Sequence, residues 1–255
     1  MQTAACSHAT HIGTSGWSYD HWCSSFYPDG LASSDRLAYY ARQFRSVEIN
    51  SSFYHLPTES TLRHWHDATP DDFVFAAKAS RYITHMKKLT APQKTLPPLL
   101  ERLAVLGNKL GPVLFQLPPH WHFNPERLAA LLDWLDGACR STFEFRDHSW
   151  FNEQCFELLS RHGVALCLYE LDGFLSPEKL TADFVYVRLH GPGAAYRGSY
   201  DRKALAAWVT ACNRWAASGR EVHLYFDNDE QAYAAHNAAR LQSMIQEQAS
   251  RHAGS

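Results

Sequence analysis

Apolar and polar residues alternate along eight short stretches of the chain, and most of the intervals between them repeat apolar residues every three to four positions. A period of two is typical of β-strands, and a period near 3.6 is typical of amphipathic helices. The predicted strands cover residues 11–15, 46–50, 73–78, 112–117, 142–146, 165–169, 184–190 and 221–227. The predicted helices cover residues 37–44, 96–111, 124–137, 152–163, 201–219 and 230–248.

Strands that alternate with helices along a chain predict a parallel sheet. Eight such units in 255 residues predict a closed (β/α)8 barrel of the TIM type rather than an open doubly wound sheet. Residues 170–183 are too few and too irregular for a crossover helix, so the barrel is expected to be irregular between its sixth and seventh strands. We expect one domain over residues 11–248, with an N-terminal lead-in at 1–10 and a flexible polar tail at 249–255.

The polar residues of these strands occupy one face. In TFEFR (142–146), Glu144 and Arg146 alternate with Phe143 and Phe145. Alternate residues of a barrel strand face inward, and the others pack against the helices. The purely apolar set suits the helix side, so the polar set is expected to point into the barrel near the C-terminal strand ends, where active sites of this fold lie. That set comprises Glu48, Asn50, Lys78, Gln116, Glu144, Arg146, Tyr169, Tyr186, Arg188, His190, His223, Tyr225 and Asp227.

Three of these residues are candidates for proton transfer. Glu48 and Glu144 lie three strands apart, roughly across the barrel, and two carboxylates that face each other over a pocket can act as acid and base. His190 is the third candidate, because an unperturbed imidazole titrates near neutral pH. The alternative is structural: the charges pair with one another and fill the barrel, although so many ionisable groups in a core are costly.

Three cations at the same mouth favour an anionic ligand. Arginine's planar fork suits carboxylate and phosphate groups, so Arg146 and Arg188 with Lys78 are assigned to anion binding. The alternative is that the two arginines neutralise the glutamates. Asn50 and Gln116 are expected to orient substrate hydroxyls. Further ligand contacts are assigned to Trp17, Tyr19, Trp150, Tyr169, Tyr225 and Asn228, although aromatic residues of the first loop often pack across a barrel rim instead.

Composition narrows the classes of function. The net charge of −2 provides no basic field for nucleic acid or an anionic membrane. The sequence shows no run of 18 apolar residues and no secretory signal. Its six cysteines are scattered and form no CxxC pair. We therefore expect a cytoplasmic protein with reduced thiols. Neither GxGxxG after the first strand nor GxxxxGK[ST] occurs. No cofactor is predicted: a divalent metal on Glu48, Glu144, His190 and Asp227 lacks a recognised ligand spacing, and the neighbouring arginines would repel it.

Several motifs along the chain resemble those of one family. They are GTSGWSYDHW and FYP within 13–28, VEINSSFYHLP (47–57), FAAKASRYITH (75–85), LGPVLFQLPP (110–119), FEFRDHSW (143–150), YVRLHG (186–191), and YFDND with NAARL within 225–241. Together they are similar to the YecE-like proteins, a family classified as a domain of unknown function. The resemblance implies a TIM-like barrel and supplies no reaction. Ser24 and Ala232 stand where the family usually has glycine, and Ala235 where proline is common.

The sequence therefore predicts an enzyme, of hydrolase, lyase or isomerase type, that uses acid–base chemistry on a small anionic substrate such as a phosphorylated sugar or a nucleotide-derived compound. One alternative is a non-catalytic protein that binds an anionic ligand or nucleic acid. A metal-dependent hydrolase or phosphodiesterase is the other. The sequence predicts no oligomeric state and no membrane partner.

Overall fold

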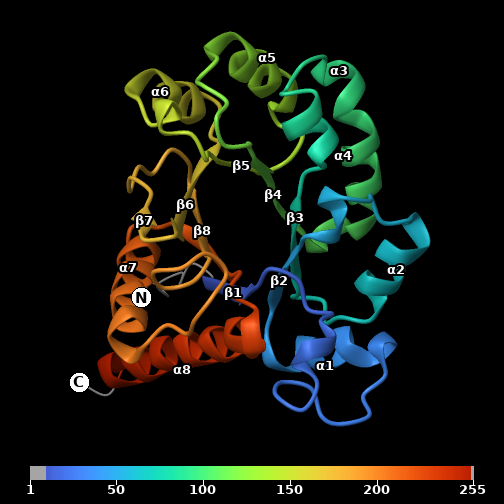
Figure 1. Ribbon diagram of the computed structural model, residues 1–255, viewed down its shortest axis with the longest axis vertical. Coiled ribbons are helices and arrows are strands. Elements are labelled where there is room, and N and C mark those ends of the chain that lie inside the picture. The colour runs from blue at the N-terminus through green and yellow to red at the C-terminus, as the bar shows by residue number, and fades with distance from the viewer. Residues whose placement is uncertain (1–9, 254–255) are drawn as a thin grey trace, which may run out of the picture.

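The computed structural model describes residues 10–253 and confirms the TIM-type barrel, with helices arranged around a ring of strands (Figure 1). Eight parallel strands follow one another around the ring in the order β1-β9-β8-β6-β5-β4-β3-β2. All eight predicted strands are present. They are β1 (Thr10–Thr14), β2 (Ser46–Ile49), β3 (Val74–Lys78), β4 (Leu110–Gln116), β5 (Ser141–Glu144), β6 (Ala165–Leu171), β8 (Phe184–Leu189) and β9 (Glu221–Phe226).

The helices on the outside of the barrel follow the predicted pattern with four differences. The helix predicted over 96–111 is α-helical only to Leu103. A 3-10 segment (Ala104–Lys109) follows, in which Gly107 leaves helical geometry (φ 53°, ψ −129°), and β4 begins at Leu110. Two short helices, Glu59–Asp67 and Pro92–Thr95, were not predicted. The helix predicted over 230–248 begins with a 3-10 turn (Glu230–Ala232), and its α-helical part continues past 248. The α-helices are α1 (Arg36–Gln43), α2 (Glu59–Asp67), α3 (Pro92–Thr95), α4 (Pro97–Leu103), α5 (Pro125–Leu135), α6 (Glu153–Arg161), α7 (Arg202–Ala217) and α8 (Tyr233–Ala253).

Two of the helix starts follow from their capping residues. The side chains of Asn124 and Asn152 accept hydrogen bonds from the backbone N–H groups of Arg127 and Cys155, three residues further on. Such caps satisfy backbone donors that the first helical turn leaves free. Within residues 10–253, no helix combines the length and the apolar character that crossing a membrane requires.

The segment between the sixth and seventh barrel strands is irregular, as predicted. A turn at Asp172 and Gly173, both with positive φ, folds the chain back on β6. The two-residue strand β7 (Phe174–Leu175) then pairs antiparallel with β6. The remainder of the segment is anchored by Thr181, whose hydroxyl donates to Val164 O and accepts from Leu166 N. The barrel therefore closes here without a crossover helix.

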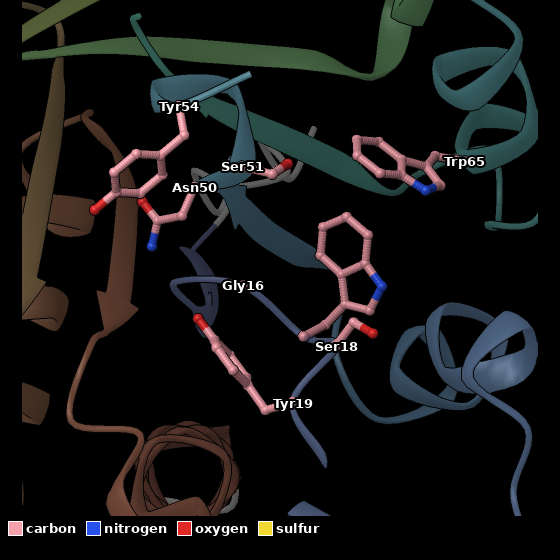
Figure 2. A pocket seen from close by; sticks show the side chains of 8 residues that line it. Gly16, Ser18, Tyr19, Asn50, Ser51, Tyr54 and Trp65 are labelled. Atoms are coloured by element: carbon pink, nitrogen blue, oxygen red, sulfur yellow. The ribbon is translucent and has the colours of Figure 1, made fainter. Parts of the chain in front are cut away.

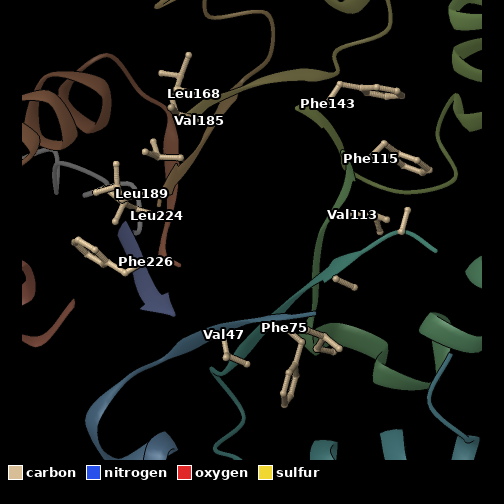
Figure 3. Close-up of a cluster of buried hydrophobic side chains, with 14 of the residues drawn as sticks. Val47, Phe75, Val113, Phe115, Phe143, Leu168, Val185, Leu189, Leu224 and Phe226 are labelled. Atoms are coloured by element: carbon tan, nitrogen blue, oxygen red, sulfur yellow. The ribbon is translucent and has the colours of Figure 1, made fainter. Parts of the chain in front are cut away.

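The apolar set of each strand faces the helices, as the alternation predicts. Figure 3 shows side chains such as Val47, Phe75, Phe115, Phe143 and Leu224 directed outward from the ring of strands. All five are buried. Burying apolar surface at about 25 cal/mol per Å² is the main stabilising contribution to such a fold. The helix ring therefore takes up the apolar residues and leaves the strands' polar residues for the barrel interior.

The barrel closes between β1 and β2 through a seam that needs a glycine. Ser15 and Glu48 form a single parallel bridge, in which Gly16 N donates to Glu48 O (2.8 Å). Next to this bridge the Tyr40 hydroxyl accepts from Thr14 N and donates to Ser46 O, and so links the two strands. A Cβ at Gly13 would lie 2.1 Å from Ser46 O, so only glycine permits the two strands to approach this closely.

Ser24 stands where similar proteins usually have glycine. Its φ of 63° lies in the left-handed region that favours glycine. We expect Ser24→Gly to raise the free energy of unfolding by about 0.5–1 kcal/mol, because an L-residue there costs about 1–2 kcal/mol and the greater chain entropy of glycine offsets part of the gain. Urea denaturation would measure the change. Ser34→Gly, in the exposed 3-10 turn Ser33–Asp35, is the control and should lower stability. A Ser24→Gly variant no more stable than the wild type would show that this loop is not strained.

Candidate functional site

The inward-facing charged residues converge on the guanidinium of Arg188. Its Nε and Nη2 donate to the two oxygens of Glu48 (3.0 and 2.9 Å), and Nη1 donates to Glu144 (2.9 Å). Nη2 also donates to Asp227 (2.8 Å) and Ser15 (3.1 Å). Since Arg188 is 1% exposed and every guanidinium nitrogen is engaged, it has little capacity left for a ligand. In the structure Arg188 is therefore an internal counter-ion to three carboxylates, and the anion-binding role expected for it stays a prediction.

Glu48 is held entirely by protein groups. One carboxylate oxygen accepts from the Ser15 hydroxyl and from Arg188, and the other accepts from the Tyr186 hydroxyl (2.7 Å) and from Arg188. The side chain is fully buried. A carboxylate with this many donors is fixed in one orientation.

Glu144 is also buried and paired on both oxygens. Arg146 donates to one oxygen and Arg188 to the other, while the Cys167 thiol lies 3.8 Å from the second. Burial alone would raise the pKa of Glu144, but the charges of Arg146 and Arg188 hold that pKa well below its usual range. Glu48 and Glu144 thus share Arg188 between them instead of facing each other across an open space.

His190 lies between the two arginines and an aspartate. Its Nε2 is 3.1 Å from Arg146 Nη2 and 3.3 Å from Arg188 Nη1. Guanidinium nitrogens only donate, so Nε2 must be the acceptor and the ring proton lies on Nδ1. Nδ1 is 2.9 Å from Asp227 Oδ2, although it has no aligned hydrogen bond among the described residues. Together these contacts orient the ring of His190.

Two cations keep capacity for a ligand. Arg146 binds Glu144 and His190 through Nε and Nη2, and within the described region no partner is found for Nη1. The ammonium of Lys78 lies 4.4 Å from the centre of the Phe53 ring and makes no ion pair with a described residue. Burial and the charge of Arg188 lower the pKa of Lys78. Lys78 is thus a partly desolvated positive charge without a direct counter-ion.

Two cavities flank this charged cluster at the C-terminal strand ends. One, of about 410 Å³, is lined by Trp17, Tyr19, Asn50, Tyr54 and Trp65 among others. Figure 2 shows Asn50 and Tyr54 on one side of it and Trp65 on the other. The second, of about 400 Å³, is lined by residues that include Gln116, Arg146, His148, Tyr169 and Tyr196. Six of the predicted site residues therefore divide between two cavities instead of sharing one.

Five predicted ligand contacts line neither cavity: Lys78, Arg188, Trp150, Tyr225 and Asn228. Trp150 is fully buried and stacks on Phe145 (ring centres 4.7 Å apart), because it faces the helix layer. Tyr225 is fully buried lower in the barrel and bonds the Ser46 hydroxyl (2.6 Å). Asn228, also buried, donates to Gly198 O (2.8 Å) and so fixes the loop after β8. Strand alternation gives the face of Tyr225 but not its depth in the barrel, and it does not apply to Trp150 and Asn228, which lie beyond the ends of β5 and β9.

Asp227 and His85 lie at the site, although the sequence analysis assigned neither of them to proton transfer or substrate binding. Asp227 is the most exposed carboxylate of the cluster (side chain 15%), and despite its burial Arg188 and His190 lower its pKa. Its inward place at the end of the last strand was visible in the sequence. His85 lies in a π-turn (Tyr82–Met86) beside Phe53, and burial together with Lys78 lowers its pKa to about 4. Such π-turns are frequent at functional sites.

The barrel and its polar mouth place the chain among TIM-type proteins, whose sites lie at this end of the strands. The chain belongs to the DUF72 family: the family described as "Protein of unknown function DUF72" matches residues 11–254. This confirms the resemblance to YecE-like proteins. The family description assigns no activity.

Relatives of the chain include two UPF0759 proteins. YunF of Bacillus subtilis (strain 168) is 27% identical over an alignment that covers 92% of this chain and 94% of YunF. YecE of Escherichia coli (strain K12) is 33% identical over 126 residues, which cover 49% of this chain and 43% of YecE. Among solved structures, a DUF72 family protein of Thermotoga maritima MSB8 has a TM-score of 0.78 at 26% identity and covers 94% of this chain and 100% of that one.

Proposed function

We propose that the mouth of the barrel is the active site of an enzyme that acts by acid–base chemistry on a small anionic substrate, such as a phosphorylated sugar or a nucleotide-derived compound. The observation that carries this proposal is the half-buried ammonium of Lys78, which has no direct counter-ion among the described residues. An unpaired charge in such a place is costly unless a ligand supplies the partner.

Lys78 and Arg146 are proposed to bind the anionic group. The charges of the cluster balance in the absence of a ligand, since Glu48, Glu144 and Asp227 contribute −3 and Arg146, Arg188 and Lys78 contribute +3. Arg188 neutralises most of the carboxylate charge at the bottom of the mouth. This leaves Lys78 and the Nη1 group of Arg146 as the donors closest to the ligand.

Asp227 is proposed to transfer the proton in place of the glutamates predicted from the sequence. Glu48 and Glu144 have both oxygens occupied by strong donors, whereas Asp227 Oδ1 has no partner among residues 10–253 and the side chain reaches the surface. His190 Nδ1 lies 2.9 Å from the other oxygen, Oδ2. A base must lie within hydrogen-bond reach of the proton that it removes, and Asp227 is the carboxylate with such access.

The cavity lined by Trp17 and Trp65 is proposed to hold the ring of the substrate. The two indoles meet edge to face with ring centres 4.8 Å apart, and Trp17 is 8% exposed. Asn50 lines the same cavity and its Oδ1 is buried without a partner among the described residues. An apolar cavity with one unused acceptor suits a sugar or base that offers an O–H or N–H group.

The proposal is tested by titrating the full-length protein with inorganic phosphate, glucose 6-phosphate and adenosine monophosphate at matched ionic strength. We expect the organic phosphates to raise the melting temperature and to bind at about one equivalent by calorimetry. A compound that binds is then incubated with the protein, and its conversion is followed by mass spectrometry. Asp227→Asn should retain binding but lose turnover by about 10²–10⁴-fold.

The outcomes separate the proposed enzyme from its alternatives. Binding without conversion, equal in wild type and Asp227→Asn, would favour a non-catalytic anion-binding protein. Binding of oligonucleotides that weakens steeply with salt would favour a nucleic-acid surface, because counter-ion release governs such binding. A metal-dependent hydrolase would need Glu48, Glu144 and Asp227 as ligands, and these oxygens are already directed to Arg188. Absence of binding by all three probes would contradict the proposal.

A further inference from the structure

The opposite end of the barrel contains a second group of chemically capable side chains. His11 of β1 is the register partner of His223 of β9, and Glu221 lies two residues before His223 on the same face. Strand alternation therefore brings two imidazoles and one carboxylate together at the N-terminal strand ends. Their ligand atoms all lie within 4.8 Å of one another. This group has no part in the function proposed for the mouth.

His223 supplies an independent observation that points to a ligand. It is 1% exposed, yet neither ring nitrogen has an aligned hydrogen-bond partner among the described residues. Buried polar atoms are nearly always satisfied, and each one left without a partner is costly. Its Nε2 lies 3.3 Å from Glu221 Oε1, and that same oxygen is 2.7 Å from His11 Nε2. The unsatisfied imidazole thus faces the other two potential ligands.

We propose that His11, Glu221 and His223 bind one divalent transition-metal ion, of the zinc class, that fixes β1 to β9 at the bottom of the barrel. Two imidazole nitrogens and one carboxylate oxygen form a common donor set for such ions, with water completing the coordination.

Binding of the metal ion requires the His11 side chain to rotate. The rings of His11 and His223 are stacked, with centres 4.8 Å apart and planes at 14°. A metal lies in the plane of each imidazole that binds it, so the ring of His11 must turn. Its side chain is 13% exposed, at the open end of the barrel, and this permits the rotation. Donor atoms would then approach to about 2.0–2.2 Å from the ion.

Arg140 sets the affinity of the proposed site. Its guanidinium bonds the second oxygen of Glu221 and lies 4.3 Å from the centre of the Phe184 ring. The pairing leaves Oε1 as the available carboxylate ligand and places a positive charge next to the ion, which weakens binding. Removal of this charge should therefore strengthen binding, although it removes a surface ion pair. A merely structural role of the three residues predicts no such gain.

The test is a titration of chelator-treated full-length protein with Zn²⁺ against a chromophoric competitor, repeated with Co²⁺ to observe ligand-field absorption. We expect one equivalent to bind, with affinity at least about tenfold lower in His11→Gln and His223→Gln and severalfold higher in Arg140→Gln. His11→Gln keeps the test valid if the buried His223→Gln fails to fold. His162→Gln, a surface histidine 3.6 Å from Asp133, is the matched control and should bind like the wild type.

Two results would overturn the proposal. One is a wild-type protein that binds Zn²⁺ no more tightly than His11→Gln. The other is a loss in His162→Gln equal to the loss in His11→Gln, which would assign the ion to dispersed surface histidines. Neither result depends on ligand binding at the mouth, so this proposal and the proposed enzymatic function can fail separately.

Discussion

Replacing Arg188 by methionine is expected to lower the free energy of unfolding by about 3–5 kcal/mol, the usual cost of removing one partner from a buried ion pair. Arg188 is 1% exposed and donates to the carboxylates of Glu48, Glu144 and Asp227. Without it, Arg146 and Lys78 alone face three carboxylates, so one negative charge remains uncompensated. Urea denaturation with linear extrapolation would measure the loss.

The loss should depend on pH in a defined direction. In the wild type, pairing with Arg188 contributes to the lowered pKa values of Glu144 and Asp227. A carboxylate whose folded pKa is lowered stabilises the protein above its unfolded pKa, near 4, and this stabilisation is lost as the pH falls through the folded pKa. The difference between wild type and Arg188→Met should therefore be largest near neutral pH and should shrink below about pH 4.

Two further variants identify the cause of that loss. Arg188→Lys keeps the charge but cannot contact all three carboxylates, so its stability should lie between those of the wild type and Arg188→Met. Glu48→Gln combined with Arg188→Met should recover part of the stability, because it removes one unpaired charge. If Arg188→Met unfolds within about 1 kcal/mol of the wild type at neutral pH, the cluster does not depend on this arginine.

The barrel was predictable because its signals are local. Alternation in stretches such as SVEIN (46–50) and FVYVRLH (184–190) marks both the strand and its inward face. Capping residues mark several helix starts. Short elements without such signals were missed. For example, α3 (Pro92–Thr95) has too few residues to show a period, and the helix that the apolar pattern extended to 111 changes to a 3-10 segment after Leu103.

The composition of the site was predictable, but the pairing within it was not. Inward direction follows from alternation, which placed Glu48, Glu144 and Arg188 correctly in the interior. Which charges meet depends on how far the strands are staggered, and this stagger brings β2, β5 and β9 to the same guanidinium on β8. Sequence therefore could not distinguish Arg188, whose donors are all used, from Lys78, which is left without a direct partner.

Replacing Lys78 by methionine is expected to separate binding from stability. The side chain keeps its length and loses its charge, so affinity for the organic phosphates should fall by about 10- to 100-fold, the equivalent of one charged hydrogen bond. The fold should be unchanged or slightly more stable, because burial and Arg188 lower the pKa of Lys78 and thus disfavour its charged form. Calorimetry would measure the affinity and urea denaturation the stability.

Lys109→Met is the matched control, because Lys109 is a buried lysine that stabilises the fold and is not expected to bind the ligand. Its ammonium donates to the backbone oxygens of His66 (2.6 Å) and Thr69 (2.8 Å), ahead of β4 and away from the mouth. Its loss removes both hydrogen bonds, and of the two carbonyl groups His66 O keeps another donor, the Thr69 hydroxyl (3.1 Å). Stability should therefore fall by about 1–3 kcal/mol while phosphate affinity stays at the wild-type value. A Lys78→Met variant that instead unfolds like Lys109→Met and binds like the wild type would make Lys78 a structural residue. The charge that carries the proposed function would then have to be Arg146 alone.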